Sequence, residues 1–173
     1  MEIWDLYDRH RNKTGKVIKR GEKPEKDHFY LSVHVCVFNS NHKMLIQQRH
    51  SCKKDFPNFW DFSAGGSART GETSQMAAQR ELFEEIGILE NFEAKRPHFT
   101  INFDEGFDDI YFIEKDIEID QLILQKDEVQ AVRWASSDEI LQMIKSGEFA
   151  PYYPGLIEFI FQSGSKPGCL SYE

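Results

Sequence analysis

Short apolar runs alternate with polar turns along the chain, a pattern that predicts strands on both sides of one central helix. Residues 29–39 and 44–49 are strongly apolar and predict two buried strands, which a polar turn at 39–42 joins as a hairpin. Further strands are predicted over residues 60–64, 92–103, 109–114 and 129–135.

Residues 73–86 contain mostly good helix formers and predict the central helix. Ala78, Leu82 and Ile86 follow i, i+4, i+8 spacing and form one apolar stripe that can pack on a sheet. Gly87 stands where a left-handed residue would end the helix. The segment is therefore expected to be an amphipathic helix with a defined end.

The N-terminal segment predicts a hairpin. Residues 3–7 and 16–19 read as two short strands, and residues 11–15 have the chemistry of the turn between them. Residues 21–27 read as a loop that leads into the main sheet.

The C-terminal part predicts two helices. Ser137 can cap a helix that ends at Gly147, and Pro154 begins a last helix over residues 153–162. The tail from Ser163 carries no predicted element. Strands around one helix followed by a helix pair predict an α/β fold, with a mixed β-sheet between helical layers.

Composition limits the class of protein. A chain of 173 residues with 40% hydrophobic residues is long enough for one globular domain. The net charge of −8 argues against a nucleic-acid partner, although bound Mg²⁺ can still attract a diphosphate. The three cysteines are odd in number and read as free thiols. Neither a signal peptide nor a membrane span is apparent, so no membrane partner and a cytoplasmic location are expected.

Three glutamates on the predicted helix form the strongest chemical signal. Glu81, Glu84 and Glu85 are spaced i, i+3, i+4, so their carboxylates project from one side and repel one another. A hard cation such as Mg²⁺ would relieve that repulsion. The alternative for an acidic cluster of this kind is a solvated helix face, and only the surrounding residues separate the two.

Those surrounding residues complete a known motif. Residues 66–88 read G-x5-E-x7-R-E-U-x-E-E-x-G-U, in which U is aliphatic. The segment resembles the signature of the Nudix family at every fixed position. The resemblance implies a Nudix-type α/β/α sandwich formed by a single domain over residues 1–173, with 66–88 as the Nudix box and 1–28 as an N-terminal hairpin extension.

The resemblance also implies roles for the motif residues. Nudix proteins typically hydrolyse a diphosphate with the help of Mg²⁺ or Mn²⁺, which neutralises the phosphates and activates water. Glu81 and Glu85 are then expected as metal ligands, and Glu84 as a third ligand or as the group that takes the proton from water. Arg80 is expected to orient a glutamate, and Glu72 to anchor the loop by pairing with Arg80.

Other residues are weaker candidates. Glu128 is the first choice for a metal ligand outside the helix, and Arg49 could hold a substrate phosphate or be a surface arginine. Gly66 is a candidate substrate-binding residue, expected to allow either a close backbone approach or an unusual dihedral in the loop. His34 is expected to be a satisfied core histidine. Competing acids are Asp104, Glu105, Asp108 and Asp109; Phe56, Phe59 and Trp60 read as core, with stacking on a substrate as the alternative.

The first 90 residues or so also resemble the isopentenyl diphosphate isomerase branch of the family. Gly65 and Ser67, however, stand where those isomerases need a cysteine and a metal-binding histidine, and Cys52 lies in a different loop. The favoured function is therefore a metal-dependent hydrolase that cleaves a diphosphate linkage in a small nucleoside-diphosphate-type or related molecule. The alternatives are an isomerase-like enzyme and a catalytically silent ligand-binding domain; a homodimer is left open.

Overall fold

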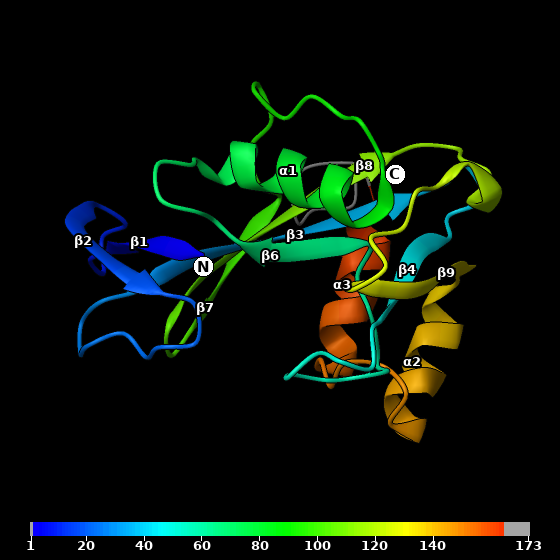
Figure 1. Cartoon of the computed structure of the whole chain (residues 1–173). Helices are drawn as coiled ribbons and strands as arrows, with labels where there is room; N and C mark the ends of the chain where they lie inside the picture. The colour runs from blue at the N-terminus through cyan, green and yellow to red at the C-terminus, as the bar shows by residue number, and fades with distance from the viewer. Residues whose placement is uncertain (1, 165–173) are drawn as a thin grey trace.

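The computed structural model describes residues 2–164 and has one layer of helix on each face of a central sheet (Figure 1). The strands are β1 (Ile3–Tyr7), β2 (Lys13–Lys19), β3 (Tyr30–Phe38), β4 (Met44–Arg49), β5 (Trp60–Asp61), β6 (Ala64–Ser67), β7 (Phe99–Phe103), β8 (Gly106–Glu114) and β9 (Val129–Ala135). The helices are α1 (Ser74–Ile86), a 3₁₀ turn (Ile119–Gln121), α2 (Ser137–Ser146) and α3 (Pro154–Ser163). The α/β/α sandwich expected from the sequence is confirmed.

The sheet is mixed. β3 runs parallel to β8 along its whole length, while β7–β8, β4–β9 and β3–β6 are antiparallel pairs. The N-terminal β1 and β2 form a separate two-stranded sheet, which Tyr7 connects to Phe29 through backbone hydrogen bonds. In Figure 1 this hairpin extends from one end of the sandwich.

Each face of the sheet packs its own core. On one face, Ala77, Ala78, Leu82 and Ile86 of α1 pack against alternate side chains of β3, and all are fully buried. On the other face, α2 and α3 pack against Cys36 and its neighbours. Period-two alternation along β3 sends Val33, Val35 and Val37 to α1 and the intervening residues to the opposite layer. Within the described residues, no helix is long and apolar enough to span a membrane.

The predicted hairpin of residues 29–39 and 44–49 opens immediately after its turn. β3 and β4 share only the pair Phe38↔Met44. Beyond it, β6 pairs with the edge of β3 that is left free and β5 with that of β4, while β9 runs along the opposite edge of β4. Ser63 bridges the gap, since its Oγ accepts from Val37 N at 2.8 Å and donates to Leu45 O at 2.5 Å. The hairpin prediction is therefore confirmed for the two strands and for their antiparallel pair beside the turn, but the pairing does not continue beyond it.

Three further sequence expectations need correction. The strand predicted over 92–103 begins only at Phe99, because Pro97 has no N–H for a ladder; Phe92 is buried in the loop before it. The N-terminal turn lies earlier than 11–15, since Asp8 accepts from two backbone N–H groups and starts it. Ser136, not Ser137, caps α2 in a capping box with Glu139. The predicted loose tail lies outside the described residues, apart from its first two positions.

A buried carboxylate ties the N-terminal hairpin to the main sheet. Asp109 is 1% exposed and accepts two hydrogen bonds from Arg11, at 2.9 and 2.7 Å. Ser74 and Thr100 donate to the same carboxylate. Burial raises the pKa of Asp109, but these hydrogen bonds outweigh it and hold the pKa below its usual value.

This arrangement gives a stability prediction. Arg11→Met should lower the unfolding free energy by about 2 kcal/mol, because Asp109 keeps its burial and loses its charged partner. Since the pKa of Asp109 is lowered, the pair contributes fully above about pH 4 and less as the pH falls further, so the difference from wild type should shrink in acid.

Urea unfolding from pH 3 to pH 7 measures this difference. Arg9→Met is the matched control. Arg9 lies on the same turn as Arg11 and pairs with Asp27, and the side chains of Arg9 and Asp27 are both more than half exposed. Equal stability of the two variants at neutral pH would contradict the role assigned to Arg11.

Candidate active site

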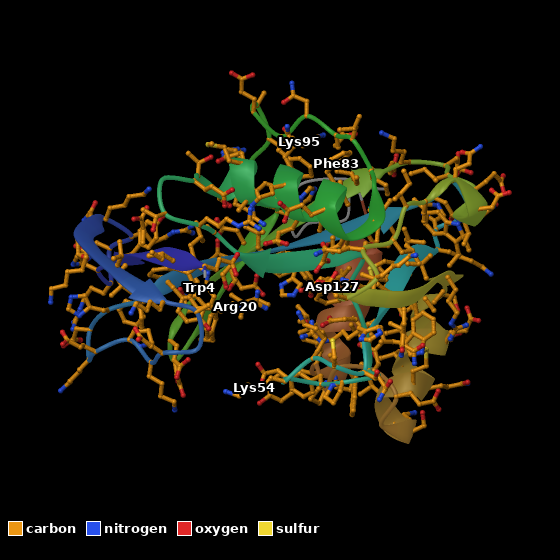
Figure 2. The ribbon with its side chains drawn as sticks, in the orientation of Figure 1. Trp4, Arg20, Lys54, Phe83, Lys95 and Asp127 are labelled. Carbon is orange, nitrogen blue, oxygen red and sulfur yellow. The ribbon has the colours of Figure 1, made fainter. Side chains whose placement is uncertain are left out.

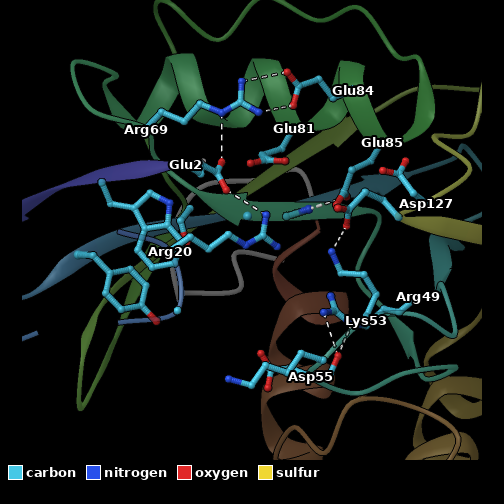
Figure 3. Close-up of a pocket in the computed structure, with 18 of the residues that line it drawn as sticks. Glu2, Arg20, Arg49, Lys53, Asp55, Arg69, Glu81, Glu84, Glu85 and Asp127 are labelled. Carbon is cyan, nitrogen blue, oxygen red and sulfur yellow. Dashed lines mark hydrogen bonds and ion pairs between the residues drawn. The ribbon is translucent and has the colours of Figure 1, made fainter. Parts of the chain in front are cut away.

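Helix α1 presents its glutamates to a pocket because both of its ends are fixed. Thr73 accepts from Met76 N at the start, and Gly87 ends the helix with φ 75°, as the sequence predicts. Glu81 and Glu85 lie one turn apart and are only 8% and 6% exposed. Figure 3 shows Glu81, Glu84 and Glu85 on the same side of the helix.

Glu85 connects β4 and β6, two strands that do not pair with each other. Its Oε2 accepts from Gln47 Nε2 of β4 at 2.8 Å and from Gly65 N of β6 at 3.0 Å. Burial, and then the charge of Glu81, raise the pKa of Glu85 to about 8. A carboxyl group so perturbed beside a pocket is typical of a functional site.

The position of the Glu81 carboxylate depends on the lack of a side chain at Gly66. A Cβ on Gly66 would lie 2.4 Å from Glu81 Oε1, so only glycine lets the strand approach the carboxylate this closely. Arg80 Nη1 donates to the same oxygen at 2.6 Å. Burial still raises the pKa of Glu81 despite this partner. The backbone at Gly66 thus comes close to Glu81, and its contact with a substrate stays a prediction.

Arg80 of α1 donates hydrogen bonds to several groups of the site. Its Nε and Nη2 donate to the two oxygens of Glu72 at 2.7 and 3.0 Å, which confirms the predicted pair. Nη2 also donates to Ser67 O, and Nη1 to Glu84 at 3.2 Å. The guanidinium thus fixes the loop before α1 and orients two of the three helix glutamates.

Glu84 is held by a second arginine that the sequence analysis did not single out. Arg69 donates to both oxygens of Glu84, at 3.2 and 3.0 Å, and its Nε donates to Glu2 at 3.1 Å. Arg20 donates to the other oxygen of Glu2 at 2.9 Å. Arg69 stands at a variable position of the motif, so nothing in the local sequence marks it. A chain of ion pairs therefore runs from α1 to the N-terminal hairpin.

The pocket has a volume of about 950 Å³, and its second wall carries both basic and acidic side chains (Figure 3). Lys53 pairs with Glu128, the acid predicted from outside the helix, and a backbone bond from His50 N to Glu128 O positions this loop. Arg49 donates to Asp55 O through Nε and Nη2, at 3.1 and 3.0 Å. Both Arg49 and Glu128 line the same pocket as Glu81, Glu84 and Glu85.

The remaining candidates lie elsewhere or have other partners. Asp108 binds Nδ1 of His34, so that histidine is satisfied, as predicted. Asp109 belongs to the hairpin contact; Glu105 lines the pocket and Asp104 does not. The core prediction for Phe56 was wrong, because it is 46% exposed in a surface loop. Phe59 and Trp60 are half-buried and lie outside the pocket lining.

The acidic wall fits a hard divalent cation in part. Among residues 2–164, no three His, Cys, Asp or Glu side chains already converge as a ligand set. Glu81 and Glu85, however, each use one oxygen for protein donors, while the second oxygen accepts no hydrogen bond from the described residues. Two such carboxylates suit Mg²⁺ or Mn²⁺, which usually take further ligands from water and substrate phosphates.

Comparison with known proteins gives a consistent result. The NUDIX domain model matches residues 28–155. An uncharacterized Nudix hydrolase of Listeria monocytogenes is 47% identical over 153 residues, which cover 88% of this chain and 90% of the relative. An isopentenyl-diphosphate Delta-isomerase of Pectobacterium atrosepticum is 29% identical over 159 residues, which cover 86% of this chain and 85% of that protein.

Solved structures support the fold. The DR0079 protein of Deinococcus radiodurans matches with a TM-score of 0.74 and 24% identity, over 91% of this chain and 98% of that one. A MutT protein of Methanosarcina mazei matches with a TM-score of 0.65 and 22% identity, over 84% and 98%. Together with the domain match and the Listeria relative, these likenesses show that the chain belongs to the Nudix hydrolase family.

Proposed function

We propose that this protein is a metal-dependent hydrolase that cleaves a diphosphate linkage in a small molecule, of the nucleoside-diphosphate type or related to it. The family generally catalyses metal-dependent hydrolysis of pyrophosphate bonds. The observation that carries the proposal is the pair Glu81 and Glu85, nearly buried and each with one uncommitted oxygen beside a pocket. The whole chain serves as one domain, with residues 66–88 as the Nudix box and residues 1–28 as a hairpin extension.

In this proposal Glu81 and Glu85 hold Mg²⁺ or Mn²⁺, and Glu84 and Glu128 flank them. A bound ion of this kind neutralises phosphate charge and lowers the pKa of a coordinated water. Glu84 and Glu128 are paired with Arg69 and Lys53, so they can join the ligand set only by exchanging those partners. Arg80 keeps Glu81 in place throughout, because its other hydrogen bonds anchor it to the loop.

Glu84 is the best placed residue to accept a proton from water. Its side chain is 36% exposed, far more than that of Glu81, so solvent can reach it. Arg69 and Arg80 fix its direction. Across the pocket, Arg49 and Lys53 supply positive charge for substrate phosphates, and Gly66 leaves the backbone open to the substrate.

A specific observation disfavours the isomerase alternative. A Cβ on Gly65 would lie 2.3 Å from Cδ2 of His34, so the imidazole occupies the space that a cysteine side chain would need. Ser67 contributes a hydroxyl near Ser32 instead of an imidazole. The acid and the metal ligand expected of the isomerases are therefore both missing. The complete set of motif glutamates in turn disfavours a catalytically silent domain.

The proposal predicts which reactions the protein catalyses. Nucleoside diphosphate derivatives and prenyl diphosphates, assayed with Mg²⁺ for released phosphate and monophosphates, should include at least one hydrolysed substrate. EDTA should abolish that turnover, because two carboxylates cannot activate water without a cation. In deuterated water, isopentenyl diphosphate should incorporate no deuterium. Metal-independent turnover, or deuterium incorporation, would contradict the proposal.

A second prediction concerns Glu85. Glu85→Gln should lose at least about 100-fold in turnover, since a neutral amide binds Mg²⁺ poorly. Its metal-free form should nevertheless melt no lower than wild type. The pKa of Glu85 is raised to about 8, so its ionisation costs wild-type stability as the pH rises from about 4.5 to about 8, and the amide avoids this cost.

Melting curves at pH 5 and pH 8.5, with and without Mg²⁺, measure both effects. The advantage of Glu85→Gln in metal-free buffer should grow with pH, and added Mg²⁺ should raise the melting temperature of wild type only. Glu158→Gln is the control, because Glu158 is an exposed glutamate of α3 on the opposite layer. Full activity of Glu85→Gln would remove this residue from the metal site.

A further inference from the structure

The pocket continues beyond α1 to the N-terminal hairpin, and the proposed chemistry uses only its α1 end. Trp4 and Arg20 of the hairpin line the pocket together with Tyr30. Figure 2 places Trp4 and Arg20 on the hairpin side and Asp127 and Lys54 on the other side of the opening. The hairpin lies outside residues 28–155 that match the family model, so it is not part of the domain that the model describes.

The lining of this pocket is unsuited to a hydrocarbon. Among the described residues that form it, none is Ala, Val, Leu, Ile, Met or Phe. The large apolar surfaces are the rings of Trp4 and Tyr30, which pack together with centroids 4.8 Å apart. A prenyl chain gains affinity by burying methyl and methylene groups against apolar side chains, and this pocket offers few of them. The organic half of the substrate is therefore expected to be polar.

Trp4 indicates one requirement for that polar group. The residue is 8% exposed, and its Nε1 is the one buried side-chain nitrogen or oxygen among the described residues without a hydrogen-bond partner. Indole N–H is a donor only, and a buried donor without an acceptor is unfavourable. An acceptor supplied by a ligand would satisfy it.

The register of the hairpin shows how a ligand can reach this group. Trp4 pairs with Ile18, and the next pair on the same face of the hairpin is Glu2 with Arg20, whose backbones are joined by a hydrogen bond from Arg20 N to Glu2 O. The Arg20 side chain is 54% exposed and pairs with Glu2, so exchange of this exposed ion pair would open this face. Glu2 also binds Arg69, which links this end of the pocket to Glu84.

We propose that the N-terminal hairpin is the specificity subsite for the organic half of the substrate, with Trp4 Nε1 donating to an oxygen or ring-nitrogen acceptor on a polar ring. This inference rests on the proposed function, because the ligand is the substrate of the same pocket. Arg20 turns from Glu2 toward the substrate as the ring enters. Prenyl diphosphates, which lack an acceptor outside the diphosphate, are poor ligands.

Calorimetric titration in Mg²⁺ tests the subsite with non-hydrolysable probes. Methylenediphosphonate represents the diphosphate alone, and the α,β-methylene diphosphates of adenosine, guanosine, cytidine and uridine add a polar ring. Dimethylallyl methylenediphosphonate adds a hydrocarbon. Wild type should bind at least one nucleoside probe about tenfold more tightly than methylenediphosphonate. The dimethylallyl probe should show no such gain.

Trp4→Phe keeps an aromatic ring and removes the N–H. This substitution should lower the affinity for that nucleoside probe about fivefold and leave the affinity for methylenediphosphonate unchanged. Trp134→Phe is the matched control, since Trp134 packs against the core outside the pocket lining. If Trp4→Phe does not fold, wild type is compared with the phenyl riboside counterpart of the probe, which lacks ring acceptors and should bind about fivefold more weakly than the nucleoside probe.

Three results overturn the subsite: no nucleoside probe exceeds methylenediphosphonate, removing the N–H or the ring acceptors has no effect, or the dimethylallyl probe gains as much affinity as the nucleosides. These failures are separable from failure of the proposed function. Metal-dependent hydrolysis without the Trp4 effect overturns the subsite alone. Binding with the Trp4 effect but without turnover of any substrate overturns the hydrolase assignment alone.

Discussion

The carboxylate of Glu85 is the constraint on which the site depends. It connects α1 to two strands that do not pair with each other, through Gln47 on β4 and the backbone of Gly65 on β6. An ionised group in this position is unfavourable without a cation, which is why its pKa rises to about 8. The fold therefore places a carboxyl group where a nearby cation would favour its ionised form, and such a group exchanges stability for function.

The early end of the β3–β4 pairing, and the lack of side chains at Gly65 and Gly66, make this position of Glu85 and Glu81 possible. β3 and β4 part after a single pair, and Ser63 supplies the hydrogen bonds that their ladder would have made. Gly65 leaves room for His34 on one face of the sheet, and Gly66 leaves room for Glu81 on the other. Arg80 then holds the loop and the glutamates together from the helix side.

Local sequence was sufficient for most elements and for the motif chemistry. The periodicity of α1 and the Gly87 cap depend on neighbouring residues, so the helix was predictable, as were the bounds of β4 and β9. The pairing of β3 with β6 and β8 depends on residues far apart in the chain, which no local pattern reveals. For the same reason no local pattern marks Arg69 or Gln47, whose hydrogen-bond partners come from other elements.

The central claim is that Glu81 and Glu85 together bind the catalytic cation, and anomalous scattering from crystals grown with Mn²⁺ tests it most directly. The account predicts an anomalous peak within about 2.2 Å of one oxygen of each carboxylate, on the pocket side of Gly66. It also predicts that Gln47 and Gly65 still bind the other oxygen of Glu85. A manganese ion bound only by Glu84 and Glu128 would contradict the account. So would crystals in which the protein hydrolyses its substrate without manganese at α1.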